Sequence, residues 1–187
     1  MLKRLTDILA ASVGLGLFAV PMVIVAVLVK ATSPGPILYW SDRVGQDNRI
    51  FRMPKFRSMR VETPAIATHL MVETHMHLTP IGSFLRKSSL DELPQMWSIL
   101  MGDMTIVGPR PALFNQDDLI ELRTRAGVHR LKPGLTGWAQ VNGRDELPIP
   151  EKVKLDVEYL ERRSIWMDLK TIFLTVERVL RSSGVSH

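Results

Sequence analysis

The stretch from Arg86 to Pro111, RKSSLDELPQMWSILMGDMTIVGPRP, places acidic, basic and proline-rich segments close together. The acidic pair Asp91 and Glu92 follows a basic pair that begins at Arg86, and a Gly-Pro-Arg-Pro turn with Arg110 at its centre closes the stretch. A carboxylate can act as a nucleophile, a second carboxylate can help to bind Mg²⁺, and arginines can bind phosphate oxygens bidentately. The stretch therefore predicts chemistry on a phosphate group.

A purely structural interpretation of the acidic pair competes with this one. Ser89 and Glu92 have the spacing of a capping box, in which the acid only decorates a helix start. Such a helix would place Pro94 at its fifth position, at a cost of roughly 3 kcal/mol. A helix that begins at Asp91 instead places Pro94 at the third position, where the backbone N–H has no partner anyway. We expect the helix to begin at Asp91, and the residues alone leave both interpretations of the pair open.

Length and composition limit the class of protein. A chain of 187 residues predicts one domain with a sizeable core. With 24 basic and 19 acidic residues the net charge is +5, which suits anionic partners such as a membrane surface, a nucleotide-sugar or nucleic acid. The absence of cysteine excludes disulfides and thiolate metal sites. His69, His75 and His77 lack a second cluster at ligand spacing, so we expect no histidine metal site.

An uncharged apolar run extends from Ile8 to Val29. At about 1.5 Å per residue it is long enough to cross a hydrocarbon core of about 30 Å. Three interpretations compete: a spanning helix, a cleaved signal peptide and a re-entrant hairpin. The run is longer than a signal-peptide core, and the residues that follow it make a poor cleavage site. A membrane role is therefore the leading prediction.

Charge on both sides of the run favours the re-entrant arrangement. Lys3 and Arg4 precede it, and a series of basic residues follows it: Lys30, Arg43, Arg49, Arg52, Lys55, Arg57 and Arg60. Both ends therefore look cytoplasmic under the positive-inside rule. Pro21 can kink the helix so that it turns back, although kinked spanning helices also exist. We predict a helix-break-helix membrane segment at residues 1–32, which enters one leaflet, and a cytoplasmic catalytic domain at residues 33–187.

The remaining elements predict an α-rich α+β fold. The cluster Ser33-Pro34-Gly35-Pro36 should end the membrane helix. Short strands are expected at 37–40 and 50–53, helices at 117–125, 154–163 and 166–180, a strand at 104–107 and a loop at 132–137. The basic stretch 55–59 is either a solvated surface or a contact for phosphate or lipid headgroups.

Several blocks, taken together, resemble the bacterial sugar transferases, the small monotopic phosphoglycosyl transferases. They occur in the family's order over nearly the whole chain: Pro21, then residues 55–59, 85–95, 102–104, 108–111 and 132–144. The resemblance implies a monotopic membrane enzyme with amphipathic interfacial helices. It also implies transfer of a sugar 1-phosphate from a UDP-sugar to a polyprenol phosphate such as undecaprenyl phosphate. UMP is released, Mg²⁺ is the cofactor, and the location is the cytoplasmic face of the bacterial inner membrane.

The same resemblance implies roles for individual residues. Asp91 is expected to be the nucleophile that becomes linked to the phosphosugar, and Glu92 its partner in binding Mg²⁺ or handling a proton. Arg86 and Arg110 are expected to contact phosphate or to organise the site. Further expected residues are Lys55, Arg57, Lys132 and Arg144 for substrate or phosphate, Asp156 and Asp168 as supporting acids, and Pro21, Pro109 and Pro111 as structural residues.

Two departures from the family pattern qualify these expectations. Val20 precedes Pro21, where the family often has a serine, so the helix break loses a hydroxyl hydrogen bond. Longer relatives carry extra membrane helices and a further domain, and we expect this chain to correspond to the minimal catalytic unit. The donor is expected to carry an N-acetylated amino sugar or a plain hexose.

Two other functions remain open at this point. One is a membrane-tethered protein that binds anionic lipid or nucleic acid through its basic surface. No nucleic-acid-binding module is recognisable, so we expect no nucleic-acid partner. The other is a nucleotide-sugar hydrolase, which uses water as the acceptor.

Overall fold

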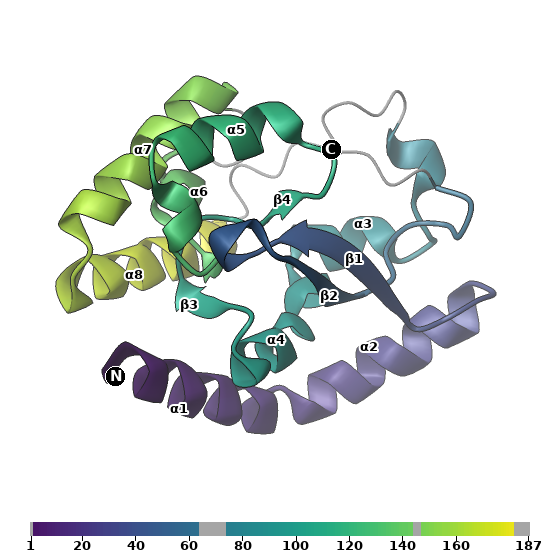
Figure 1. Cartoon of the computed structure of the whole chain (residues 1–187). Helices are drawn as coiled ribbons and strands as arrows, with labels where there is room; N and C mark the ends of the chain where they lie inside the picture. The colour runs from purple at the N-terminus through teal and green to yellow at the C-terminus, as the bar shows by residue number, and fades with distance from the viewer. Residues whose placement is uncertain (1, 64–73, 144–146, 182–187) are drawn as a thin grey trace.

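A computed structural model describes residues 2–63, 74–143 and 147–181 of the chain. These residues form a mixed fold with more helix than strand, in agreement with the predicted α-rich α+β class. In Figure 1 the first two helices run along one edge of the molecule, and the small sheet lies between them and the helices α5 (Asp117–Arg125) and α7 (Ile149–Arg162).

The N-terminal segment is a bent pair of helices, as predicted. α1 (Leu2–Leu17) and α2 (Ala19–Thr32) meet at an angle of 61°. Pro21 accounts for the break, because its ring clashes with the carbonyl of Leu17 in a continuous helix. The chain leaves the helix at Phe18, and Pro21 falls in the first turn of α2, where no N–H is needed. Among the described helices none alone is long and apolar enough to cross a membrane, whereas this bent pair together is.

The helix pair buries one face and exposes the other. Its inner face packs closely on α4 (Gln95–Met101): a Cβ at Gly14 would lie 2.7 Å from the sulfur of Met96, so a larger residue there would displace the end of that side chain. Its outer face exposes a row of large apolar side chains: Leu5, Leu9, Val13, Leu17, Val20, Val23, Ile24 and Val27. An exposed apolar surface of this length is typical of a contact with lipid or with another apolar partner.

Charged side chains at the start of α1 join it to the rest of the fold. Asp7 is buried; its Oδ2 accepts a hydrogen bond from Thr105 Oγ1 at 2.7 Å, and its Oδ1 accepts one from the N–H of Ile106 at 3.0 Å. Arg4 donates to the carbonyls of Ile99 and Leu100 at the end of α4. The first turns of α1 are therefore part of the folded core.

The predicted hairpin is confirmed, with longer strands than expected. β1 (Leu38–Val44) pairs antiparallel with β2 (Ile50–Phe56), and β4 (Ala112–Leu113) adds to the other edge of β1. Pro54 is compatible with β2 because β2 is an edge strand. Lys55 lies one residue further along β2, on the same face as the buried Met53, which packs against α4.

A second, parallel pair of strands corrects one prediction. Residues 132–137 were expected to form a loop, but β5 (Gly134–Thr136) pairs with β3 (Thr105–Val107). Gly134 belongs to this strand because two backbones meet there: a Cβ would lie 2.2 Å from the nitrogen of Gly108. Glycine is generally unfavourable in strands, so β-sheet propensity did not predict β5.

The start of α4 corrects a second prediction. The helix does not begin at Asp91: residues Leu90–Glu92 form a separate 3₁₀ turn, η4, and α4 begins at Gln95 with Pro94 as its N-cap. Ser89 has a left-handed backbone with φ of 56° and makes no capping hydrogen bond, so the capping box is not formed either. This left-handed residue ends the helical path after α3 (Gly82–Lys87) and places the acidic pair in a tight turn between two helices.

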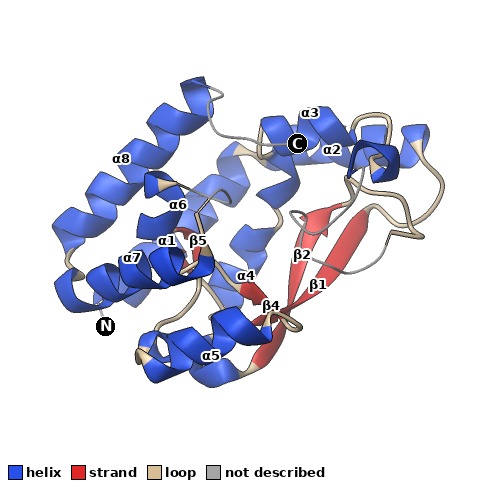
Figure 2. Ribbon diagram, turned by 90° about the horizontal axis from the view of Figure 1, so that it is seen from above, coloured by secondary structure: helices blue, strands red, loops and turns tan. Residues whose placement is uncertain are grey.

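The C-terminal part is helical. α5 has the predicted bounds; the short helix α6 (Trp138–Asn142) follows β5; and α7 begins earlier than expected, with a proline in its first turn. α8 (Ile165–Arg181) completes the described chain, and Figure 2 shows it running away from α7 at a wide angle. α8 exposes apolar side chains, with Trp166 81% and Phe173 69% accessible.

Candidate active site

The acidic pair lies in the η4 turn, between α3 and α4. Asp91 is only 7% exposed, and the side chain of Glu92 is 15% exposed. A 3₁₀ turn directs adjacent side chains differently, so the two carboxylates have different surroundings although they are neighbours in sequence.

Glu92 is held by two cations from distant parts of the chain. Its Oε1 accepts hydrogen bonds from Lys55 Nζ at 2.9 Å and from Arg110 Nη2 at 3.1 Å. Lys55 comes from β2, and Arg110 from the loop between β3 and β4. The structure thus brings four of the predicted site residues, Asp91 among them, into one cluster, with a fifth, Arg86, near Asp91.

The pKa values of the two carboxylates are shifted in opposite directions. Burial raises the pKa of Asp91 to about 6; Lys55 opposes this shift and the negative charge of Glu92 adds to it. Burial also disfavours ionisation of Glu92, but the charges and hydrogen bonds of Lys55 and Arg110 hold its pKa well below the usual range. At neutral pH Glu92 is therefore a fixed anion, whereas Asp91 changes its charge at about pH 6.

Two further features distinguish Asp91 and Lys55. Burial lowers the pKa of Lys55, although the nearby Glu92 raises it in part. Arg86, at the end of α3, lowers the pKa of Asp91 by its charge. Within the described residues no side chain donates a hydrogen bond to Asp91, whereas one oxygen of Glu92 accepts two.

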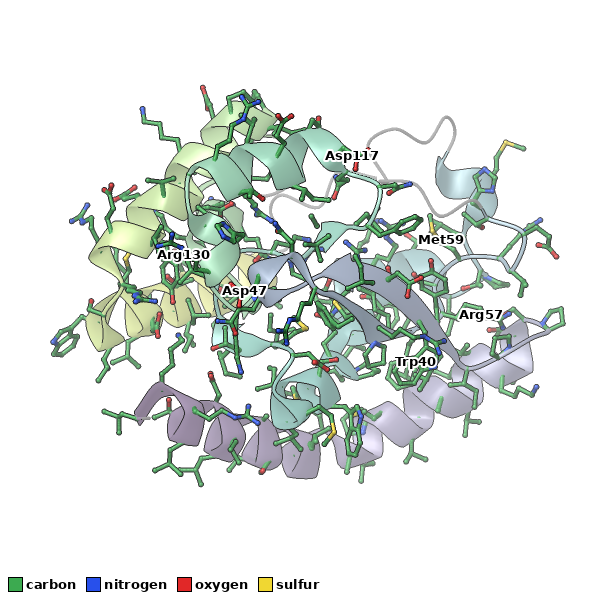
Figure 3. All side chains as sticks on the ribbon, viewed as in Figure 1. Trp40, Asp47, Arg57, Met59, Asp117 and Arg130 are labelled. Atoms are coloured by element: carbon green, nitrogen blue, oxygen red, sulfur yellow. The ribbon has the colours of Figure 1, made fainter. Side chains whose placement is uncertain are left out.

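Arg57 has a different place from the one expected. Its guanidinium donates to the carbonyl and hydroxyl of Ser33, at 2.9 and 2.7 Å, and to the carbonyl of Pro34. Figure 3 shows Arg57 at the end of the hairpin, beside the loop that follows α2. Its contacts therefore fix the end of the helix pair to the hairpin rather than reach the acidic pair.

The other predicted residues are also separate from the acidic pair. Lys132 Nζ lies beside Gly102, at 3.7 Å from the position of a Cβ there. Asp156 pairs with Arg123 at 2.6 Å. Asp168 accepts from Tyr159 at 2.7 Å and pairs with Lys3 of α1, while Arg144 lies outside the described residues.

Two residues that sequence reasoning missed are buried polar groups. Arg123 is 8% exposed, and Tyr159 is 3% exposed, with its hydroxyl oxygen 3.0 Å from the carbonyl oxygen of Val107. Burial and the hydrogen-bonded Asp168 raise the pKa of Tyr159. A signal for Arg123 existed in the sequence: it lies four residues after the buried Leu119, on the inner face of α5.

A divalent cation could use the acidic pair. No group of three or more histidine or acidic side chains arranged for a metal is present in residues 2–63, 74–143 and 147–181. Mg²⁺ often binds through only one or two carboxylates together with substrate phosphates and water. Asp91 and the oxygen of Glu92 that the two cations leave unused fit such a site.

Comparison with known proteins identifies the family of the chain. The family model described as "Bacterial sugar transferase" matches residues 1–182. The chain belongs to the bacterial sugar transferase family. The resemblance inferred from the sequence motifs is thereby confirmed.

Named relatives of this sugar transferase fall into longer and shorter proteins. It is 42% identical over 184 residues to the UDP-glucose:undecaprenyl-phosphate glucose-1-phosphate transferase of Escherichia coli (strain K12), a match that covers 94% of this chain and 39% of that protein. It is 36% identical to the UDP-N-acetylgalactosamine-undecaprenyl-phosphate N-acetylgalactosaminephosphotransferase of Aeromonas hydrophila, over 98% of this chain and 44% of that protein. The chain thus spans about two fifths of both. Uncharacterized sugar transferase EpsL of Bacillus subtilis (strain 168) is 39% identical, with 100% and 91% covered.

Proposed function

We propose that this protein transfers a sugar 1-phosphate from a UDP-sugar to a polyprenol phosphate such as undecaprenyl phosphate. The products are UMP and a polyprenyl-diphosphate sugar, and the reaction is the first membrane step in the assembly of a glycoconjugate: a polysaccharide, an O-antigen or a glycoprotein glycan. The observation that carries the proposal is the clustering of Asp91 and Glu92 with Lys55 and Arg110. Similar proteins named for such transfers, with glucose or N-acetylgalactosamine, support it.

The first step in this proposal is attack by an Asp91 oxygen on the phosphorus that carries the sugar. A bond forms between that oxygen and the phosphorus, and the bond from the same phosphorus to the bridging oxygen breaks, so UMP leaves with the electron pair. A carboxylate whose pKa burial raises to about 6 is more nucleophilic than an ordinary one and is still mostly ionised at neutral pH.

The second step transfers the phosphosugar to the lipid. An oxygen of the polyprenol phosphate attacks the same phosphorus, the bond to Asp91 breaks, and the carboxylate is regenerated. Two successive displacements allow a soluble donor and a lipid acceptor to use one site at different times.

The surrounding charges favour these displacements. Lys55 and Arg110 already bind the Glu92 anion, and together with Arg86 they can stabilise negative charge on the phosphate oxygens. Because its pKa is lowered, Glu92 is a poor proton carrier near neutral pH, so we assign it to fixing these cations and to binding metal. Mg²⁺, bound by Asp91, Glu92 and phosphate oxygens, would neutralise the charge of the pyrophosphate.

We also propose that the bent helix pair enters only the cytoplasmic leaflet of the bacterial inner membrane. The exposed outer face of α1 and α2 and the 61° bend support this arrangement. Trp97 on α4 and the apolar face of α8, both exposed, would lie in the interface. The acidic pair would then be close to the lipid phosphates.

The reaction is tested by UMP release from purified protein with Mg²⁺ and a panel of UDP-sugars, which includes UDP-glucose, UDP-galactose and UDP-N-acetylgalactosamine. Multiple turnover that requires added polyprenol phosphate supports the transferase. Multiple turnover without it supports the hydrolase instead. Absence of UMP release across the panel, with salt-sensitive binding of nucleic acid or anionic vesicles, contradicts enzymatic function.

Membrane topology needs a separate experiment. Single cysteines placed at each chain end of this cysteine-free protein should both be protected in intact cells from an impermeant thiol reagent added outside. Labelling of the N-terminal cysteine alone would contradict the re-entrant arrangement and favour a spanning helix.

A further inference from the structure

The loop that carries Arg110 is held through its backbone. Its three successive carbonyl oxygens each accept a hydrogen bond from a different element: Pro109 from Gly134 N–H at 2.9 Å, Arg110 from Arg123 Nη1 at 2.7 Å, and Pro111 from Arg43 Nη1 at 3.1 Å. The two prolines have a fixed φ and no N–H to donate. The path of this loop is therefore set mainly by what its carbonyls bind.

The central contact comes from a buried ion pair. Arg123 is 8% exposed and Asp156 is 1% exposed. Nε and Nη2 of Arg123 donate to Oδ2 of Asp156 at 2.9 and 2.6 Å, which leaves Nη1 for the carbonyl of Arg110. Because a guanidinium is a rigid planar fork, Asp156 fixes the direction in which Nη1 points.

Stability alone does not explain a charged pair at this position. Burying two charges is costly, and apolar residues of similar size often replace such a pair without loss of stability. A small hollow of about 30 Å³ lies against Pro109, Arg110 and Arg123, so close packing does not hold the loop on that side. On that side the hydrogen bond from Arg123 to the carbonyl of Arg110 fixes the position of the loop.

We infer that Arg123 and Asp156 are positioning residues, which hold the backbone of Arg110 so that its guanidinium reaches Glu92 beside Asp91. The chain of contacts runs from Asp156 through Arg123 to the Arg110 carbonyl, and from Arg110 Nη2 to Glu92 at 3.1 Å. The kinetic consequence rests on the proposed function, since it requires that Arg110 acts on a phosphate. The hydrogen bond by which Arg123 holds the backbone of Arg110, called the clamp below, does not depend on the proposed function.

Arg123→Lys is the test variant. Lysine keeps a positive charge for Asp156, but its ammonium is a point charge that lacks the fork needed to bind Asp156 and the carbonyl together. Arg125→Lys is the matched control: Arg125 lies on the same helix, its ion-pair partner among the described residues is Glu121, and both side chains are largely exposed. The melting temperature of each purified protein shows whether it is folded.

The first readout needs no substrate: amide hydrogen exchange of the segment 108–113. Faster exchange in Arg123→Lys than in Arg125→Lys is expected, because the loop loses one of its three carbonyl contacts. Equal exchange in the two variants would overturn the inference, whether or not the protein turns over UDP-sugars. If Arg123→Lys does not fold, the double variant Arg123→Met/Asp156→Leu takes its place, since it removes both charges together.

The second readout is a double-mutant cycle on UMP release. Arg123→Lys should lower kcat/KM roughly 10- to 100-fold, as expected for a displaced phosphate contact. In the Arg110→Ala background the same change should cost less than about twofold, because the side chain that it positions is gone. An equal loss in both backgrounds would overturn the positioning role. No turnover by the wild type, with exchange still altered, would refute the proposed function and leave the clamp intact.

Discussion

Asp91 and Asp156 are both buried aspartates near Arg110, but their surroundings differ. Asp156 has one dedicated partner, since Arg123 binds it through two nitrogens, and the pair is electrically balanced. Asp91 shares its cluster with another carboxylate, and within the described residues no side chain hydrogen-bonds to it. Burial raises the pKa of both, and for Asp156 the charge of Arg123 opposes the shift.

Under the proposed function, the difference separates a reactive carboxylate from a structural one. A buried carboxylate such as Asp156, with one oxygen that accepts two hydrogen bonds from the same guanidinium, orients that neighbour. A buried carboxylate that accepts no side-chain hydrogen bond from the described residues and lies beside several cations, as Asp91 does, has the surroundings expected of a reactive group. Removing the charge of Asp91 should therefore mainly lower activity, whereas removing the charge of Asp156 should mainly lower stability.

The largest effect is expected from Asp91→Asn. Loss of the nucleophile should lower UMP release by at least about 10⁴-fold. The stability of the variant should be slightly higher than that of the wild type at pH 7. The pKa of Asp91 in the folded protein lies above its ordinary value, so the ionised side chain opposes folding at that pH. UMP assays and thermal melts of the same preparation measure both. Retained turnover, or a clear loss of melting temperature, would contradict the assignment.

Asp156 should show the reverse pattern, mainly in stability. Asp156→Leu alone leaves the buried Arg123 charge without its partner and should lower the free energy of unfolding by about 3–5 kcal/mol. Arg123→Met/Asp156→Leu should recover most of that loss. Denaturant unfolding of the two variants measures it, and an equal loss in both would mean that the charge pair itself is not the source of the cost.

Glu92→Gln is expected to have an intermediate effect, about 10²- to 10³-fold on kcat/KM. The amide keeps the shape but removes the anion that orients Lys55 and Arg110. The Mg²⁺ concentration needed for half-maximal rate should rise as well. An unchanged Mg²⁺ dependence would remove Glu92 from the proposed metal site and leave it only as an anchor for the two cations.

The smallest effect is a shift of the pH profile. Because the reactive form of Asp91 is the ionised one, kcat/KM of the wild type should increase with pH through about 6. Lys55 lowers the pKa of Asp91. Lys55→Met should therefore move the rise of kcat/KM to higher pH, by about one unit. A rise that stays in place, or moves to lower pH, would contradict the coupling.

Residue types and their order predicted the family of this chain, but not the contacts of every proposed site residue. Asp91, Glu92, Lys55 and Arg110, which belong to the motifs that carry the family resemblance, lie together in the structure. Arg57, Asp156 and Asp168 have suitable side chains, yet the fold uses them to join segments far apart in the sequence.

The misplaced elements have similar causes. The start of α4 was missed because it depends on the left-handed backbone of Ser89, which no sequence rule predicts for a serine. β5 was missed because it begins with a glycine, which only the approach of two backbones explains. The break at Phe18 was predictable, since Pro21 imposes it by local geometry.

The most direct test of the account is one measurement without acceptor lipid. Protein at high concentration is mixed with Mg²⁺ and the donor that it uses. Released UMP is then counted against protein, and the protein is digested for mass spectrometry. A nucleophilic Asp91 predicts at most one UMP per protein and a sugar-phosphate mass on the peptide that contains Asp91. Continuous UMP release, or a single burst with no mass added to that peptide, would contradict it.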